Sequence, residues 1–266
     1  MNKYFDKIFV INLFDKTERW DKVRRQFKNR KIDVERFIAV DGRCKKEGDK
    51  ACLAKLNSFE MAYDIKILNK SKYPLRELLP ASSLTIGTII LLRAMVKNGW
   101  KRMLICEDDV VLSRGLENNF KNGIKGVKDR NWDVLYLGCG NKCGVNGISY
   151  DKSKKTPHPS TLNQFIDDEL YVKHKFDLRG NCEKCKFVTE LISVPVKPGG
   201  TWCYAYSLEG AKKVLKVLEK DAGQHIDHIV GNLIRKKKAR ALAFDPPIVW
   251  HEEGAIRSDS DIPWEW

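Results

Sequence analysis

The stretch KRMLICEDDVVL (101–112) places three acids, Glu107, Asp108 and Asp109, directly after the apolar run MLIC. Charged side chains are rarely fully buried without partners, so these acids are expected where a buried strand reaches the surface or a ligand. In open α/β sheets, ligands bind beyond the carboxyl ends of the strands. The interpretation of this stretch therefore depends on whether its neighbours alternate between strands and helices.

Predicted strands and helices alternate from the start of the chain. The run KIFVIN (7–12) predicts a strand, and KTERWDKVRRQFKNR (16–30) predicts a helix with Trp20, Val23 and Phe27 on one face. The run VERFIAVDG (34–42) predicts a second strand. A strand–helix–strand unit implies parallel strands, so the fold class is α/β with a mainly parallel central sheet.

The same alternation continues along the chain. Helices are expected over 51–70 and, after a connection through Pro74 and Pro80, over 84–98 with Ser82 or Ser83 as the N-cap. Further strands are expected over 101–112, 132–138, 188–196, 201–207 and 246–250, and further helices over 115–127, 208–220 and 226–238. The polar segment 139–186 interrupts this pattern, which predicts one domain over 1–266 with an insertion.

Composition restricts the class of protein. The chain has 266 residues, of which 42% are hydrophobic and 32% charged, as in soluble globular proteins. The longest apolar stretch, LTIGTIILLRAMV (84–96), is too short for a bilayer and contains Arg93. Asp6 interrupts what would be the apolar region of a signal peptide. We therefore expect no transmembrane segment and a cytoplasmic location.

The formal net charge of +14 attracts polyanions such as nucleic acid, anionic membrane or phosphorylated small substrates. A lysine-rich, solvated surface gives the same number, and the basic run RKKKAR (235–240) fits the end of a helix. Without aromatic interleaving or a recognition module, no nucleic-acid partner is expected.

The acids themselves allow two interpretations. Adjacent carboxylates repel one another unless a cation or hydrogen-bond donors compensate, and oxygen ligands on a short loop suit Mg²⁺ or Mn²⁺ when a diphosphate completes the shell. The alternative is a turn or helix N-cap with solvated acids.

Five segments in order resemble glycosyltransferase family 25, the lipooligosaccharide and procollagen galactosyltransferase-like group. They are FVINLFDKTERW (9–20), RFIAVDG (36–42), MLICEDDVVL (103–112), WDVLYLG (132–138) and GTWCYAYSLEGAKKVL (200–215). The resemblance implies a GT-A fold, a divalent Mn²⁺ or Mg²⁺ ion and a UDP-sugar donor. It also implies inverting transfer of a hexose to a protein (collagen-like) or glycan acceptor.

The resemblance also implies roles for particular residues. The acids at 107–109 occupy the place of the family's DxD-like motif, with Asp109 as the main metal ligand. Glu107 or Asp108 would face the donor ribose or a metal-bound water, and His251 would complete the metal shell unless it is a surface histidine. The nucleotide pocket would be lined by Asn12, Arg19, Val40, Asp41 and Gly87.

For the base that deprotonates the acceptor, Asp227 is the first candidate, although aspartate at that position also suits the N-cap of a helix over 228–238. Glu252 and Glu253 are its rivals.

The chain also departs from the family pattern. In LTIGTIILLRAM (84–95), Ile86 and Gly87 are kept, but Leu91 and Leu92 replace a Ser-His pair, and Phe14-Asp15 stands where basic residues are common. These changes leave a second function open, that of an inert GT-A domain that binds nucleotide-sugar or glycan.

The eight cysteines include two close pairs, CGNKC (139–143) and NCEKC (181–185). Four thiolates at Cys139, Cys143, Cys182 and Cys185 would suit structural Zn²⁺, with disulfides or free thiols as alternatives. Because no secretory signal is seen, a disulfide framework is not expected. The remaining cysteines, Cys44, Cys52, Cys106 and Cys203, are interpreted as core or loop residues.

Overall fold

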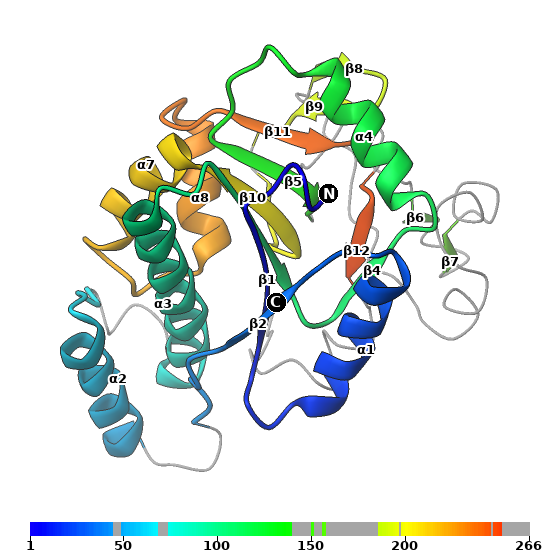
Figure 1. Cartoon of the computed structure of the whole chain (residues 1–266). Coiled ribbons are helices and arrows are strands. Elements are labelled where there is room, and N and C mark those ends of the chain that lie inside the picture. Colours follow the sequence, from blue (N-terminus) through cyan, green and yellow to red (C-terminus); the bar gives the residue numbers. More distant parts are fainter. Residues whose placement is uncertain are drawn as a thin grey trace.

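The computed structural model describes residues 1–44, 49–68, 74–139, 150–151, 156–157, 186–196, 198–245 and 247–251. Within these ranges an eight-stranded sheet has the order β2-β1-β3-β10-β5-β11-β9-β8 (Figure 1). Its strands are β1 (Lys7–Asn12), β2 (Glu35–Ile38), β3 (Arg102–Glu107), β5 (Val134–Gly138), β8 (Lys186–Thr189), β9 (Ile192–Val194), β10 (Cys203–Ser207) and β11 (Ala241–Phe244).

The sheet is mixed, with one predominant strand direction. Strand β1 pairs in parallel with β2 and β3, and β11 pairs in parallel with β5. Strands β10 and β9 run against their neighbours, so six of the eight strands point the same way. The reversal of β10 brings its first residue, Cys203, beside Cys106 near the end of β3.

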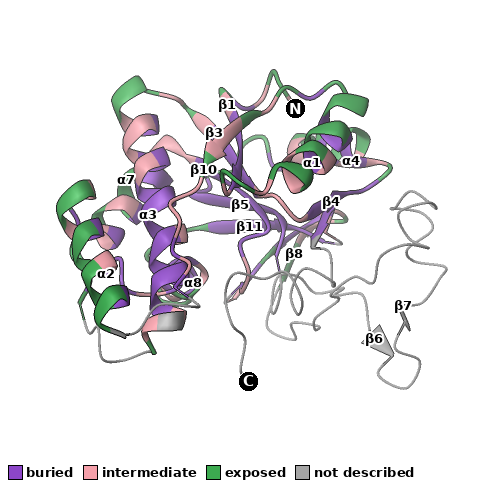
Figure 2. Ribbon diagram, turned by 90° about the horizontal axis from the view of Figure 1, so that it is seen from below, coloured by how far each residue is buried: buried purple, intermediate pink, exposed green. Residues whose placement is uncertain are grey.

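Helices and a small ribbon cover the two faces of the sheet (Figures 1 and 2). On one face lie α2 (Asp49–Tyr63), α3 (Leu75–Asn98), α7 (Leu208–Leu218) and α8 (Ile226–Arg235). On the other lie α1 (Thr17–Asn29), α4 (Leu116–Gly126) and the ribbon formed by β4 (Val110–Leu112) and β12 (Val249–His251). Alternate residues of β3 supply the two cores, since Met103 and Ile105 pack in the first and Leu104 and Cys106 in the second.

Helix α3 differs from its prediction. It begins at Leu75 rather than near residue 84, so Pro80 lies inside the helix and Ser82 and Ser83 are buried within it instead of capping it. It ends as predicted, with Gly99 at φ +67° as a left-handed C-cap.

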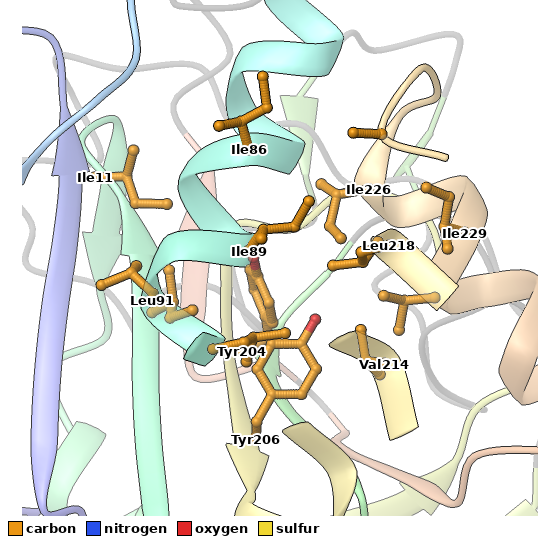
Figure 3. Packing of buried hydrophobic residues seen from close by; sticks show 14 of the residues in the cluster. Ile11, Ile86, Ile89, Leu91, Tyr204, Tyr206, Val214, Leu218, Ile226 and Ile229 are labelled. Carbon is orange, nitrogen blue, oxygen red and sulfur yellow. The ribbon is translucent and has the colours of Figure 1, made fainter. Parts of the chain in front are cut away.

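The apolar character of α3 serves the core. The segment Glu77–Asn98 is long and apolar enough to span a membrane by length and composition, and 72% of its most apolar window is buried inside the protein. Its residues Ile86, Ile89 and Leu91 pack near Tyr204 of β10 and Ile226 of α8 (Figure 3).

The acidic stretch is not one strand. Strand β3 ends at Glu107, Asp108 and Asp109 form a turn, and β4 leaves the main sheet to pair antiparallel with β12. Three buried apolar residues on β4 follow the turn directly. The chain therefore leaves the core, presents the acids at the sheet edge and re-enters the core.

The expectation that the chain has no disulfides is wrong. Cys44 bonds to Cys52, and Cys106 bonds to Cys203. The Cα atoms of the two pairs are 5.9 and 4.1 Å apart, and the second pair lies directly across the β3–β10 ladder. All four residues are buried, which fits the first part of their interpretation as core or loop residues.

Most of the predicted insertion 139–186 lies outside the described residues. Its described parts include the short antiparallel pair β6 (Tyr150–Asp151) and β7 (Thr156–Pro157).

Candidate functional site

Four elements end or begin at one edge of the sheet. The carboxyl ends of the parallel strands β1 and β3 lie side by side, because Ile11 is in register with Glu107. The amino end of the antiparallel strand β10 reaches the same edge, since Cys203 is opposite Cys106. The first turn of α8 joins them through a hydrogen bond from the backbone N–H of Gly200 to Asp227 Oδ2 (3.0 Å). Polar groups from distant parts of the sequence thus meet beyond the strand ends.

Asp108 is held by side chains from β1 and α1. The amide of Asn12 donates a hydrogen bond to Asp108 Oδ2, and Arg19 Nη1 lies 3.3 Å from Asp108 Oδ1. Burial and the adjacent Asp109 carboxylate raise the pKa of Asp108 to about 6, although the contacts with Asn12 and Arg19 act in the opposite direction. This carboxyl therefore changes charge close to neutral pH.

The orientation of the Asn12 amide is set by its own neighbours. Asn12 is 1% exposed, and its carbonyl oxygen accepts hydrogen bonds from the guanidinium of Arg36 on β2. Its amide nitrogen donates to the carbonyl of Lys16 (2.9 Å) as well as to Asp108. Arg36 also donates to the carbonyls of Leu13 and Phe14. The loop after β1 is therefore fixed beside the acids by a buried polar network.

Glu107 turns toward the other side of the site. The hydroxyl of Thr201 donates to Glu107 Oε1 (2.7 Å), and the backbone N–H of Glu107 donates to the carbonyl of Trp202 (2.9 Å). Asp227 accepts from the backbone N–H groups of Gly200 (3.0 Å) and His228 (2.8 Å). The short segment 200–202 therefore contacts both acids.

A cavity of about 140 Å³ opens beside the acids. Its lining comes from the ends of β1 and β3, from α1, from the loop after β2 and from the first turns of α3. The lining residues are Ile11, Asn12, Leu13, Arg19, Ala39, Val40, Gly42, Arg43, Pro80, Ser83, Leu84, Glu107, Asp108 and Asp109. The lining thus combines apolar side chains with acids and arginines, as in many ligand pockets.

Gly42 allows the loop after β2 to approach α3. A Cβ atom at this position would lie 2.1 Å from Ser83 Oγ and 2.5 Å from the carbonyl oxygen of Leu79. No side chain fits in that space. Glycine at this position therefore brings Val40 and Arg43 to the wall of the cavity.

Asp41 is engaged by Arg43 rather than lining the cavity. The Arg43 guanidinium contacts Asp41 (2.6 and 2.9 Å) and Asp15 (2.7 and 3.0 Å). The hydrogen bonds from Arg43 lower the pKa of both carboxyl groups. This arrangement neutralises much of the charge of Arg43 at the rim of the cavity.

The structure brings most of the predicted site residues together, but not all of them. Asn12, Arg19, Val40, Glu107, Asp108 and Asp109 line one cavity. Gly87 is buried on α3, where a Cβ atom would lie 3.3 Å from the ring of Phe37, and it is not part of that lining. Leu91 and Leu92, which replace the polar pair of the family, are buried in the core.

The structure describes some of the candidates for the base and the late metal ligand, but not all of them. Asp227 lies in the first turn of α8, whose N-cap is His225, so the alternative interpretation of Asp227 as the helix cap is wrong. The backbone of His251 pairs with Val110, the residue after Asp109. Glu252 and Glu253 lie outside the described residues.

The described side chains give little support to the predicted metal sites. Among them, no group of three His, Cys, Asp or Glu residues is arranged to hold a metal ion. The proposed zinc ligand Cys139 is disulfide-bonded, so its sulfur is not a thiolate ligand, and this part of the zinc prediction is wrong. The other three cysteines of that set, Cys143, Cys182 and Cys185, lie outside the described residues.

Four residues have contacts at the site that the sequence did not reveal, namely Arg36, Arg43, Ser83 and Thr201. Arg36 lies within RFIAVDG and Thr201 within GTWCYAYS, so both were in segments already noted. Their roles depend on hydrogen bonds across 24 and 94 residues of sequence, which periodicity does not indicate.

Comparisons with known proteins identify one family. The family model described as glycosyltransferase family 25 (LPS biosynthesis protein) matches residues 5–230. A search of curated proteins found no match.

Among solved structures, A197 from STIV has 11% identity and a TM-score of 0.40, over 89% of this chain and 79% of that one. Mannose-1-phosphate geranyltransferase from Thermus thermophilus has 13% identity and a TM-score of 0.30, over 90% and 72%. At TM-scores below 0.5, neither similarity bears on the activity of this chain.

Proposed function

The chain belongs to glycosyltransferase family 25, and we propose that it transfers a hexose from a UDP-sugar to a glycan or protein (collagen-like) acceptor. The proposal includes a GT-A type arrangement, a divalent cation and inversion at the anomeric carbon. The observation that carries it is the cavity in which Asn12, Arg19 and Val40 lie beside the three consecutive acids 107–109. The apolar residues of the lining suit a base and sugar, and its charged residues suit a diphosphate with its cation.

The residues at the turn are compatible with a cation that is shared with the donor. Mn²⁺ or Mg²⁺ in such sites takes one or two carboxylates, with substrate phosphates and water as the other ligands, so three protein ligands are not required. Asp109 and Glu107 are proposed as ligands from their place in the DxD-like motif of the family, whereas Asp108 contacts Arg19 and Asn12. His251 is a further candidate because β12 pairs with β4 immediately after Asp109. A bound cation would offset the negative charge that develops on the departing UDP.

Residues of the chain itself would bind the nucleotide and accept the proton. Asn12, Arg19 and Val40 would hold the nucleotide, and Asp227 would accept the proton from the acceptor hydroxyl. The acceptor oxygen then forms a bond to the anomeric carbon as the bond from that carbon to the UDP oxygen breaks. Two backbone N–H groups donate to Asp227 and hold its carboxylate in place. Glu253 is the alternative base.

The test is release of UDP from UDP-glucose and UDP-galactose in the presence of Mn²⁺ and candidate acceptors. We expect turnover with at least one donor. No turnover, combined with thermal stabilisation by UDP plus Mn²⁺, would instead support the inert nucleotide-sugar-binding domain. If the protein shows no turnover and no stabilisation, both functions are contradicted. Salt-sensitive DNA retention would then favour a polyanion-binding role.

Asp109→Asn tests the cation assignment directly. We expect this variant to lose the thermal stabilisation that Mn²⁺ adds to UDP, because the amide removes the charge that binds the cation. Asp129→Asn is the matched control, since Asp129 is exposed on the loop after α4 and away from the cavity lining. Unchanged stabilisation in Asp109→Asn would contradict the assignment of Asp109 as a metal ligand.

A further inference from the structure

We propose that Thr201 is a positioning residue, which holds the Glu107 carboxylate in its working orientation and ties it to Asp227. This inference rests on the proposed function. Thr201 lies two residues before β10 and is 4% exposed. Its single hydroxyl proton is donated to Glu107 Oε1 over 2.7 Å. A short bond to a charged acceptor is among the stronger hydrogen bonds in proteins.

The bond restricts a side chain that would otherwise have several rotamers. Glu107 is the last residue of β3, where the strand ends at the cavity. Its backbone is held by the carbonyl of Trp202, but that contact does not fix the rotation of the carboxylate about the side-chain bonds. The β-branched Thr201 has a restricted χ1 and is buried, so its hydroxyl is a fixed donor that selects one orientation of the acid.

The same segment reaches the candidate base. Gly200, with φ +70°, directs its backbone N–H to Asp227 Oδ2. The β3–β10 ladder and the Cys106–Cys203 disulfide anchor the other end of the segment beside Glu107. Residues 200 and 201 therefore connect the acid on the donor side with the acid on the acceptor side. This connection fixes the separation between the two carboxylates during transfer.

The experiment compares Thr201→Val with Thr201→Ser in the full chain, using steady-state kinetics with the best UDP-sugar donor. Valine keeps the volume and removes the hydroxyl, whereas serine keeps the hydroxyl. We expect Thr201→Val to lower kcat about 10- to 100-fold, because small displacements of reacting groups have effects of this size. The KM for the donor should change less than about threefold, because Asn12, Arg19 and Val40, which are proposed to hold the nucleotide, are untouched. Thr201→Ser should recover most of kcat.

A double-mutant cycle tests whether Thr201 acts through Glu107. Adding Thr201→Val to Glu107→Ala should cause little further loss of kcat, since the partner of the hydroxyl is already absent. Ser207→Ala is the stability control: it lies at the other end of β10, where its hydroxyl accepts from the Gly210 N–H (3.0 Å) and caps α7. This control should unfold at a lower temperature with kcat unchanged.

Three results would overturn the role of Thr201 alone, each with an active wild-type chain. They are wild-type kcat in Thr201→Val, a serine variant as impaired as the valine variant, and losses in the double variant that simply multiply. A wild-type chain without turnover on any UDP-sugar would overturn the proposed function first, and the role of Thr201 together with it.

Discussion

At the scale of single residues, Asp108 shows how the acidic cluster is accommodated. Three consecutive carboxyl groups would repel one another, yet Asp108 is held by Asn12 and Arg19 while Glu107 is held by Thr201. These contacts direct the two acids to different partners. Glu107 and Asp108 are thus not equivalent, because their carboxylates have separate partners.

The raised pKa of Asp108 predicts a pH dependence of stability. The folded chain keeps this proton up to about pH 6, whereas an unfolded aspartate loses it near its ordinary pKa of 3.8. Between these values the folded state binds more protons, so the contribution of Asp108 to the free energy of unfolding falls as the pH rises. Asp108→Asn removes this contribution. The variant should therefore gain stability relative to wild type between about pH 4 and pH 6.

The measurement is urea unfolding of both proteins at several pH values, in metal-free buffer. Asp129→Asn is again the control, because its exposed carboxyl should produce no comparable change. Parallel pH profiles for wild type and Asp108→Asn would contradict the raised pKa.

Much of the cavity lining could be predicted from short motifs, while the hydrogen bonds that connect its residues could not. Asn12, Arg19, Val40 and the acids stand in motifs whose order along the chain was recognisable, and they line one cavity. Gly87 was in an equally recognisable motif but packs against Phe37 instead. Arg36 on β2 and Thr201, two residues before β10, form hydrogen bonds to Asn12 and Glu107 on other strands, and these become visible only when the register of the sheet is known.

At the scale of elements, the sequence predicts where strands lie better than how they are directed. The apolar run at 201–207 was recognised as a strand, but its reversal between β3 and β5 depends on the path of the preceding segment. The early start of α3 has a similar cause. Pro80 ordinarily disfavours a helix interior, but Leu78 and Leu79 on the same turn are buried in the core and outweigh that local preference.

The contact between β5 and β12 predicts a coupling between elements. A Cβ atom on Gly138 would lie 2.0 Å from the carbonyl oxygen of Val249, and β12 in turn pairs with β4 directly after Asp109. Gly138→Ala should therefore push β12 outward and destabilise the fold by about 1–3 kcal/mol. It should also weaken the stabilisation by UDP plus Mn²⁺, because the acidic turn is attached to β4.

Thermal unfolding with and without UDP plus Mn²⁺ measures both effects. Gly115→Ala is the matched control, since the nearest atom to its Cβ would be the side-chain amide of Asn119 at 3.1 Å, which can move. A destabilised Gly138→Ala protein that keeps the full ligand-induced stabilisation would show that β12 does not position the acidic turn.

At the scale of the whole molecule, the disulfides change the expected setting of the protein. Reduced thiols are the expectation from the sequence, yet Cys44–Cys52 and Cys106–Cys203 are bonded. Disulfides persist mainly in oxidising compartments, or inside hyperthermophiles. We therefore propose that the chain matures in one of these two settings.

The sequence separations predict how much each bond contributes to stability. The cysteines of the first pair are 8 residues apart and those of the second 97. If cross-links act mainly by restricting the unfolded chain, the losses on removal are about 2.5 and 4.7 kcal/mol, respectively. The Cys106→Ala/Cys203→Ala variant should therefore be less stable than the Cys44→Ala/Cys52→Ala variant in urea unfolding.

The two disulfides should also differ in their effect on enzymatic activity. The Cys106–Cys203 bond joins β3 to β10 beside Glu107 and Thr201, so its removal alone should also lower turnover at temperatures below the unfolding transition. Thiol titration under denaturing conditions verifies that the wild-type protein is oxidised. Equal stability losses in the two variants would contradict the prediction, because the expected losses differ with the length of the closed loop. Reactive thiols at these four positions in the wild-type protein would also contradict it, because the bonds would then not be formed.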